Sequence, residues 1–532
     1  MLRWASGEFL IYYAVLAFAM FTVFQSAYNF SLPTNLNFTN YSHNLRAGWM
    51  GRPMDNSDAQ WRSFREPLPL AILLFGGFLA LNGMARMIGH RRAWSFDFSM
   101  RVRAALTLAF LIVLHGLHTI KILVLVGGNF LISSTCKGKR INVIFTWIYN
   151  IGLLFALEYF KVSYRDHPLL SIAESFFNLL PAAVPRWSVT FNITILRLIS
   201  YNVDYYYSFQ GYSALQHREG CKECSDNGNG DPCDRRRIQE APSRDSFTFI
   251  NCLIYVLYPP LYLAGPIITF NNFYSQIQRP MRPSTMEVLT YALRWVVSFL
   301  TIEVMLHYCY VVAIKNNQAW IDFRPLDFAA LSYLNLTVVW LKLLIIWRFF
   351  RLVALFDGIV PLENMARCMT NNYSSLAFWR GWHRSFNQWI VRYMYIPLGG
   401  STTALYNIWP IFTFVAIWHD IHLNMLLWSW LICLFILPEI VLSWLAQKRG
   451  WEGPQYRHWI AAAAGANMLL MSVANLVGFV VGASGIQTIL GSLMSASGVL
   501  FVVALAGTCY CAAHVLLEIR ETERSYGIFN KY

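Results

Sequence analysis

The sequence predicts an all-α protein that crosses a membrane many times, with about 10 to 12 transmembrane or re-entrant helices. Hydrophobic residues make up 56% of its 532 residues and charged residues only 13%, whereas soluble domains average about 45–50% and 25%. Aromatic residues make up 16%, which suits the aromatic belts where a bilayer meets water. This composition excludes a disordered chain, a collagen and a coiled coil, and it argues against a soluble enzyme.

Each helix is expected where about 20 mostly apolar residues follow one another, because that length spans a bilayer. Such runs lie at about 9–27, 68–88, 104–132, 142–160, 247–271, 288–314, 327–350, 404–418, 422–446, 459–483 and 487–518. Weaker runs, which are aromatic and interrupted, lie at about 168–185, 188–208 and 373–398. No internal repeat is visible in the sequence, which is unfavourable for a transporter built from repeats.

Two features predict the orientation of the chain in the membrane. The segment 26–67 carries N-glycosylation sequons at Asn29, Asn37 and Asn40, so it is expected in the lumen. The next loop, at about 86–103, is rich in arginine and is expected in the cytosol, together with both termini. The net charge of +14 then fits basic loops beside anionic headgroups or cofactors, and no nucleic-acid partner is expected.

The one sizeable hydrophilic insert, at 211–245, contains a possible metal site. One histidine and three cysteines are a ligand set that can bind zinc tetrahedrally. Here these residues are His217, Cys221, Cys224 and Cys233. Their spacing is loose, and the stretch between the last two cysteines is rich in Gly, Asn and Asp. The alternative is a disordered loop with free thiols.

Polar residues inside a membrane are costly and are functional candidates, and here they concentrate at 348–422. His419 follows the apolar run 411–418, where a neutral imidazole can accept a proton from a hydroxyl as a general base. His383 lies in a segment dense in Trp and Arg, and helical spacing would let it share a polar tunnel with Asn387. The alternatives are hydrogen-bonded histidines at the membrane interface and an aromatic belt.

Six arginines form a basic cluster in the same region. They are Arg348, Arg351, Arg367, Arg380, Arg384 and Arg392. Guanidinium groups bind pyrophosphate and a 3′-phosphate, such as those of coenzyme A, through charge-assisted hydrogen bonds. Positive-inside bias is the alternative for some of these arginines. A glycine-rich phosphate loop is missing from the sequence, so nucleotide hydrolysis has no support.

Several motifs together resemble the membrane-bound O-acyltransferase family. They read Tyr-Pro-Pro-Leu-Tyr-Leu-Ala-Gly-Pro at 258–266, Trp-Arg at 379–380 with His383 after it, Tyr-Ile-Pro-Leu-Gly-Gly-Ser at 395–401, and Trp-His-Asp at 418–420. Further segments resemble the Gup (glycerol uptake) branch, the fungal relatives of Hedgehog acyltransferase. These segments are 55–58, 371–379, 418–421, 474–479 and 518–528. The resemblance covers nearly the whole chain and is weakest at 1–45 and 211–245.

The resemblance implies an acyl-CoA-dependent acyltransferase whose helices surround a catalytic tunnel. The family's near-invariant catalytic histidine falls on His419, and its second catalytic position falls on His383. The residues expected to bind the substrates are Trp379, Arg380, Asn387, Arg392, Tyr393, Arg348, Arg351 and Trp418. No metal or cofactor is required, although Cys368 matches a cysteine that binds haem in the Hedgehog branch. A free or palmitoylated loop cysteine is the alternative for Cys368.

The Gup branch further implies remodelling of GPI anchors. A long-chain acyl group would pass from acyl-CoA to the sn-2 hydroxyl of the anchor's lyso-phosphatidylinositol, in the endoplasmic reticulum membrane, with the plasma membrane as a second location. The expected partners are acyl-CoA, the lyso-GPI anchor or the lipid of a GPI-anchored protein, and membrane lipids. The alternatives are a glycerol–proton symporter, an acyltransferase that modifies proteins, and a regulator without catalysis.

We therefore divide the chain into five parts. An N-terminal anchor helix and luminal loop occupy 1–67, and further transmembrane helices occupy 68–210. The hydrophilic loop at 211–245 precedes the expected catalytic core at 246–446. C-terminal transmembrane helices and a cytosolic tail form 447–532.

Overall fold

The computed structural model describes residues 3–163, 174–184, 186–210, 233–281, 283–450 and 454–528. It confirms the all-α prediction, since the strands in these ranges are two short ones, β1 (Leu45–Ala47) and β2 (Pro53–Asp55). They pair antiparallel, with Leu45 opposite Asp55. Within the same ranges, nine helices are long and apolar enough to cross a membrane.

The nine candidate spans account for most of the expected apolar runs. They are α1 (Gly7–Phe30), α4 (Leu68–Arg91), α5 (Phe96–His115), α6 (His118–Cys136), α7 (Arg140–Ser163), α15 (Thr285–Tyr308), α21 (Leu423–Arg449), α22 (Pro454–Phe479) and α24 (Ala496–Ser525). Other long helices are α9 (Trp187–Phe209), α17 (Pro325–Phe356), α20 (Ala404–His419) and α23 (Gly482–Leu493). Short helices connect them: α2 (Phe38–Tyr41), α3 (Ala59–Arg65), α11 (Asp234–Gln239), α12 (Phe249–Val256), α13 (Pro259–Tyr262), α14 (Phe270–Gln278), α16 (Val311–Asn316), α18 (Ser375–Gly381) and α19 (Arg384–Ile390).

Several of the predicted runs are divided in the structure. The run 104–132 belongs to α5 and α6, which separate at Gly116. This glycine has a φ of +56°, and a Cβ there would lie 2.7 Å from the carbonyl oxygen of Leu180. The run 487–518 is divided between α23 and α24, and Ser495 caps the second helix by accepting a hydrogen bond from the Gly498 N–H. The weak run 373–398 forms α18, α19 and a π-helical turn, η5 (Val391–Tyr395).

The run 247–271 does not form one span, because Pro259 and Pro260 interrupt it. It forms α12, α13 and the start of α14, all of them largely buried within the protein. Pro260 has no N–H to donate to the carbonyl of Val256, four residues earlier. The fully buried Arg197 of α9 donates to that carbonyl instead, at 3.2 Å, and to the Leu261 carbonyl at 2.5 Å. The arginine thus provides a donor to the Val256 carbonyl, which Pro260 leaves without its helical partner.

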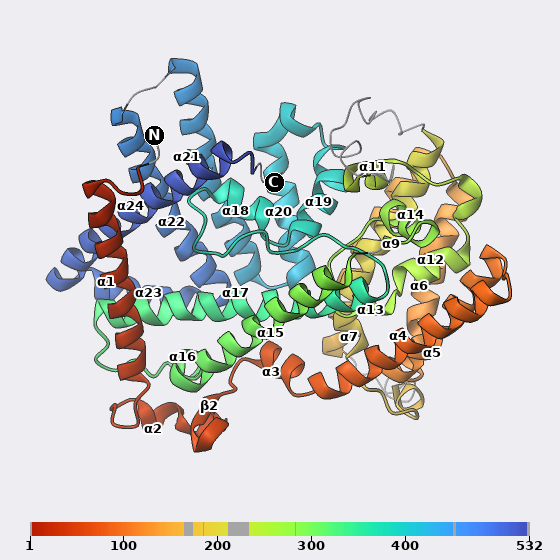
Figure 1. Cartoon of the computed structure of the whole chain (residues 1–532), viewed down its shortest axis with the longest axis horizontal. Coiled ribbons are helices and arrows are strands. Elements are labelled where there is room, and N and C mark those ends of the chain that lie inside the picture. The colour runs from red at the N-terminus through yellow and green to blue at the C-terminus, as the bar shows by residue number, and fades with distance from the viewer. Residues whose placement is uncertain are drawn as a thin grey trace.

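The helices form two groups on either side of the long helix α17, which runs across the middle of the molecule (Figure 1). One group contains α4, α5, α6 and α7, and the other contains α1, α21, α22 and α24. The N-terminal helix α1 packs against α24, and the Trp4 indole N–H donates to Thr522 at 3.0 Å. The helices α18, α19 and α20 lie between the two groups, where the candidate site is found.

Candidate active site

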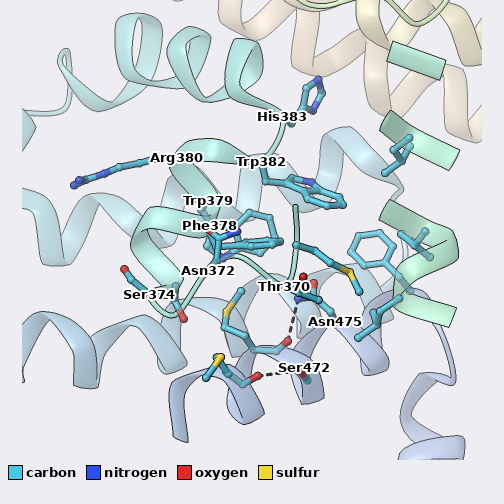
Figure 2. Close-up of a pocket in the computed structure, with 18 of the residues that line it drawn as sticks. Thr370, Asn372, Ser374, Phe378, Trp379, Arg380, Trp382, His383, Ser472 and Asn475 are labelled. Carbon is cyan, nitrogen blue, oxygen red and sulfur yellow. Dashed lines mark hydrogen bonds between the residues drawn. The ribbon is translucent and has the colours of Figure 1, made fainter. Parts of the chain in front are cut away.

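A cavity of about 1780 Å³ lies between α1, α17, α18, α19, α20, α21, α22 and α24. Its walls are mostly aliphatic and aromatic side chains. Six of the residues expected at the site line it: His383, His419, Trp379, Arg380, Asn387 and Trp418. Figure 2 shows Phe378, Trp379 and Trp382 grouped among the lining residues, below His383. The structure therefore brings both histidines to one cavity, although 36 positions separate them in the sequence.

His419 is the last residue of α20 and is exposed toward the cavity. Its ring centre lies 4.8 Å from that of Trp418 and 6.0 Å from that of Trp428. Asn192 of α9 holds this end of α20: the Trp418 indole N–H donates to the Asn192 carbonyl at 2.9 Å, and the Asn192 amide donates to the Trp418 carbonyl at 3.4 Å. His419 thus lies at a helix end that Asn192 holds in place, and its ring is in apolar surroundings.

His383 is buried and adopts the left-handed conformation, with a φ of +45°. A residue other than glycine usually pays about 1–3 kcal/mol for such a conformation, and such residues cluster at functional sites. The backbone turn is held by Asn364, whose carbonyl accepts from the Arg384 N–H at 3.0 Å and whose side chain accepts from the Ser385 N–H at 3.2 Å. The His383 ring stacks on Trp347 with ring centres 4.4 Å apart.

The segment 258–266 supports this turn from behind. The Ile267 N–H that follows it donates to the Ser385 hydroxyl at 2.8 Å. Gly265 lines the cavity, and a Cβ there would lie 2.5 Å from the Cα of Leu261. The glycine therefore allows the chain to turn tightly onto Leu261 beside the cavity.

Glu439 of α21 anchors α18, the helix that carries Trp379 and Arg380. Its carboxylate accepts hydrogen bonds from the Ser374 hydroxyl and from the Ser375 and Leu376 N–H groups, the last two at 2.8 and 3.3 Å. The anchored Trp379 ring packs edge to face against Trp428, with centres 5.6 Å apart. Our sequence reasoning missed Glu439. A single carboxylate inside the apolar run 422–446 was the signal that could have found it.

Comparison with known proteins places this site in a family. Residues 179–481 match the membrane-bound O-acyltransferase family, and this range includes both histidines. The chain is 37% identical to membrane-bound O-acyltransferase GUP1 of Saccharomyces cerevisiae, over 99% of this chain and 93% of that protein. The chain belongs to the membrane-bound O-acyltransferase family. It is an acyltransferase of the GUP1 type.

Two further relatives show which membrane-bound O-acyltransferases the chain resembles more and less strongly. Membrane-bound O-acyltransferase gup1 of Schizosaccharomyces pombe is 36% identical over 98% of this chain and 90% of its own length. Protein-cysteine N-palmitoyltransferase HHAT of Mus musculus is 25% identical over 51% of this chain and 57% of its own length. The resemblance to the Gup branch and the more distant relation to Hedgehog acyltransferase are both confirmed.

Four of the residues expected to bind substrate lie outside the cavity lining of this acyltransferase. Arg392 is buried and pairs with Asp204 at 2.8 Å, and the Tyr393 hydroxyl donates to the same carboxylate at 2.9 Å. Arg348 and Arg351 pair with Glu363, at 3.4 and 3.6 Å. These contacts join α9 to the η5 turn and α17 to the segment that follows it. We therefore propose no direct role in substrate binding for these four residues.

Arg380 differs from these paired arginines. It lines the cavity and is exposed, and no hydrogen bond or ion pair of its side chain is present among the described residues. Figure 2 shows its side chain extended away from the aromatic group around Trp379. It is therefore positioned to meet an anionic group at the edge of the cavity.

The structure describes only two of the residues predicted to bind zinc or haem, Cys233 and Cys368. His217, Cys221 and Cys224 lie outside the described residues. Cys233 is buried at the start of α11, where its sulfur accepts from the Arg236 N–H at 3.4 Å. Cys368 is exposed, lies 3.3 Å from the Thr370 hydroxyl and is not among the residues that line the cavity. The zinc and haem hypotheses stay predictions.

Proposed function

We propose that this acyltransferase moves a long-chain acyl group from acyl-CoA to the sn-2 hydroxyl of the lyso-phosphatidylinositol in GPI anchors, in the endoplasmic reticulum. The observation that carries the proposal is a large apolar cavity with His419 and His383 both in its wall. The choice of acceptor and of membrane follows from the resemblance to the Gup branch.

In the proposed reaction, His419 accepts the proton of the acceptor hydroxyl as its oxygen attacks the thioester carbonyl. The carbon–sulfur bond then breaks, and the departing thiolate takes the proton back from His419. A thiolate is a good leaving group, so the reaction needs no covalent intermediate on the enzyme. The exposure of His419 toward the cavity gives a substrate direct access to the imidazole.

His383 is proposed to orient the thioester or to stabilise the negative charge that develops on its carbonyl oxygen. Two features support this role. The Trp347 ring fixes the plane of the imidazole by stacking, and the Trp418 ring is close to both histidines, 6.0 Å from the ring centre of His383 and 4.8 Å from that of His419. A preorganised group costs no reorganisation when the charge develops.

The two ends of acyl-CoA require different surroundings, and the cavity offers both. Val15 and Phe18 of α1 and Leu505 and Ala512 of α24 form an apolar wall for the acyl chain. Arg380 is the proposed contact for the phosphates of coenzyme A, since its guanidinium is exposed.

Acyl transfer by the purified protein tests this function. The protein is incubated with radiolabelled long-chain acyl-CoA and, in separate reactions, with lyso-GPI, lyso-phosphatidylinositol, glycerol or an acceptor peptide. We expect label on the lyso-GPI lipid at the highest rate. Label on the peptide alone would instead support protein acylation. Transfer to none of them, with glycerol flux in reconstituted vesicles, would support the symporter.

A further inference from the structure

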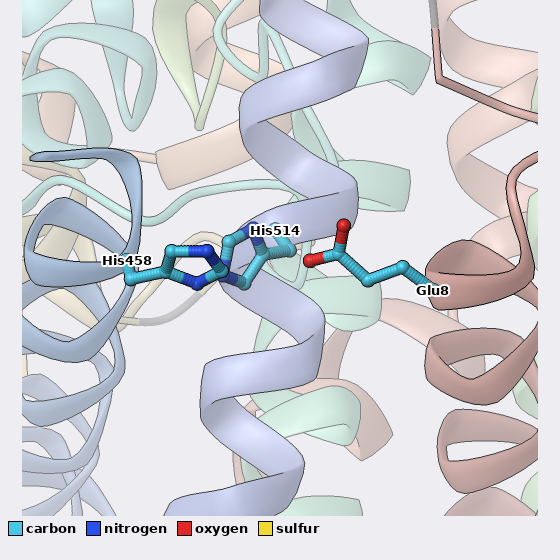
Figure 3. Close-up of side chains that lie close together, drawn as sticks. All are labelled: Glu8, His458 and His514. Atoms are coloured by element: carbon cyan, nitrogen blue, oxygen red, sulfur yellow. The ribbon is translucent and has the colours of Figure 1, made fainter. Parts of the chain in front are cut away.

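A cluster of three metal-ligating side chains lies away from the two histidines of the active site. Glu8 of α1, His458 of α22 and His514 of α24 approach one another there, and their ligand atoms all lie within 4.8 Å of each other. Figure 3 shows the Glu8 carboxylate extending from α1 toward the two imidazole rings. Three helices that are far apart in the sequence thus contribute one potential ligand each.

His514 provides the second observation that points to a ligand. Its side chain is fully buried, and neither ring nitrogen has a hydrogen-bond partner among the described residues. Buried polar side chains nearly always have partners, so such a group calls for an explanation, and an ion is one of the few available. The ring stacks on Tyr12, with centres 4.9 Å apart, and its centre lies 5.0 Å from that of His458.

The two other side chains already have the hydrogen bonds that orient metal ligands. His458 Nδ1 lies 2.5 Å from the Tyr510 hydroxyl, which leaves Nε2 as the nitrogen that can bind a metal. The Tyr12 hydroxyl donates to the Glu8 carboxylate. Hydrogen bonds of this kind fix the orientation of histidine and carboxylate ligands around metals in proteins.

The charge near the cluster is compatible with a cation. Arg457 precedes His458 in the sequence and would repel a metal ion if its charge were uncompensated. Its guanidinium donates to the Glu518 carboxylate at 2.9 Å, and the same carboxylate accepts from the Arg3 N–H at 2.6 Å. Glu8 then supplies the negative charge for the metal itself.

We propose that Glu8, His458 and His514 bind a divalent transition metal of the Zn²⁺ class. Two imidazoles and one carboxylate are a ligand set that suits this ion, with water in the fourth position. Bonds of about 2.0–2.2 Å place tetrahedral ligand atoms roughly 3.4 Å apart. The ligand atoms, which lie within 4.8 Å of one another, therefore need to approach by roughly 1.4 Å at most.

A metal here would fasten α1 to α22 and α24. These three helices also contribute Val15, Met471 and Leu505 to the cavity wall. The ion is therefore proposed as a structural one, which fixes one wall of the cavity without touching the reacting groups. This inference does not depend on the acceptor lipid.

The test measures zinc bound to the full-length purified protein by mass spectrometry, after dialysis against Zn²⁺. The variants are Glu8→Gln, His458→Gln and His514→Gln, and the exposed His90→Gln is the matched control. A Cys221→Ser/Cys224→Ser variant removes the thiols of the loop. We expect one ion per chain in the wild type, the control and the loop variant, and at least about tenfold weaker binding in the three ligand variants.

Two further readouts make the result decisive. Zn²⁺ should raise the unfolding temperature of the wild type but not that of Glu8→Gln, the variant with the least effect on packing. Co²⁺ bound in place of Zn²⁺ should show no thiolate charge-transfer band. The proposal is overturned if the wild type binds no Zn²⁺ or Co²⁺, if all three ligand variants bind as the wild type does, or if loss of the loop thiols abolishes binding.

Discussion

His383 combines a strained backbone with the imidazole that the proposed mechanism uses, and substitutions can separate the two. Glycine accepts a φ of +45° without strain, and asparagine tolerates it better than alanine does. We expect the free energy of unfolding of His383→Gly to lie within about 1 kcal/mol of the wild-type value. Its acyl-transfer activity should be mostly lost. His383→Asn should fold equally well and keep more activity, since its amide still donates a hydrogen bond.

The measurement for this series is the initial rate of acyl transfer beside the unfolding temperature in detergent. His383→Ala serves as the comparison, because it should lose both stability and rate. Equal rates for His383→Gly and the wild type would show that the reaction does not use the His383 imidazole. A large loss of stability in His383→Gly would instead show that the side chain mainly holds the turn.

Substitution of Arg392 tests whether this residue, which was expected to bind substrate, instead stabilises the fold. Its partner Asp204 is fully buried, so Arg392→Gln leaves a buried charge unpaired and should cost about 3–5 kcal/mol of stability. Asp204→Asn keeps an acceptor for the Tyr393 hydroxyl and removes the charge. The double variant Arg392→Gln/Asp204→Asn should therefore recover most of the loss.

The double variant also answers the question of substrate binding. Its KM for acyl-CoA, measured from initial rates, should match that of the wild type. If the double variant has normal stability but a KM raised tenfold, Arg392 binds the phosphates of acyl-CoA, as our sequence analysis expected.

At the scale of single residues, sequence analysis named six residues that line the cavity, but it did not predict which arginines are already paired. His383 and His419 stand out because they are polar residues in apolar surroundings. The pairing of Arg392 with Asp204 joins positions that are 188 apart, and that of Arg348 with Glu363 depends on how a loop folds back. Such contacts are decided by tertiary packing, which charge patterns along the chain do not contain.

Among the secondary-structure elements, α18 depends most visibly on one distant side chain. Glu439→Gln keeps the shape of the side chain but removes the negative charge at the start of α18 and one acceptor oxygen. We expect a loss of about 1–3 kcal/mol, because hydrogen bonds to a charged group are lost. Glu521→Gln, an exposed position, is the matched control and should change stability by less than about 0.5 kcal/mol.

Thermal unfolding in detergent measures this difference, and initial rates show whether the helix positions Trp379. If Glu439→Gln is as stable and as active as Glu521→Gln, the anchoring of α18 is unimportant. The helix would then be held by its other contacts, which include the packing of Trp379 against Trp428 and Phe412 and the hydrogen bond from the Ser375 hydroxyl to Asn467.

Hydrophobic runs predicted the existence of helices well but their ends poorly. The spans α1, α4, α7, α15 and α21 lie where about 20 apolar residues follow one another. The division at Gly116 is not visible as a change in hydrophobicity, because it depends on a positive φ and on the nearby Leu180 carbonyl. The break at Pro259 could have been read from the two prolines, since neither can donate within a helix.

The orientation of the whole molecule in the membrane stays a prediction. The structure shows which of the three sequons are accessible and can therefore test it. Asn37 is buried, and its side chain exchanges hydrogen bonds of 3.0 Å with the backbone of Ile321, so it cannot carry a glycan in the folded protein. Asn40 is exposed. If this segment is luminal, Asn40→Gln should remove a glycan, whereas Asn37→Gln should leave the glycan and lower stability.

Glycosidase treatment of the protein made in a eukaryotic host shows each glycan as a shift in electrophoretic mobility. Asn29, which is also exposed, is substituted in parallel so that each site is counted separately. A protein that carries no glycan at any of the three positions would contradict the luminal placement of 26–67. The cytosolic placement of the loop at about 86–103 and of both termini would then need to be reassigned.

The central claim is that the cavity holds the catalytic base, and His419→Ala tests it most directly. His422→Ala is the matched control, since His422 lies three residues away, is 72% exposed and is not among the residues that line the cavity. The measurement is the initial rate of acyl transfer to lyso-GPI at equal amounts of folded protein. We predict a loss of about 10²–10⁴-fold for His419→Ala and less than twofold for His422→Ala. A His419→Ala protein that transfers acyl groups at the wild-type rate would contradict the account.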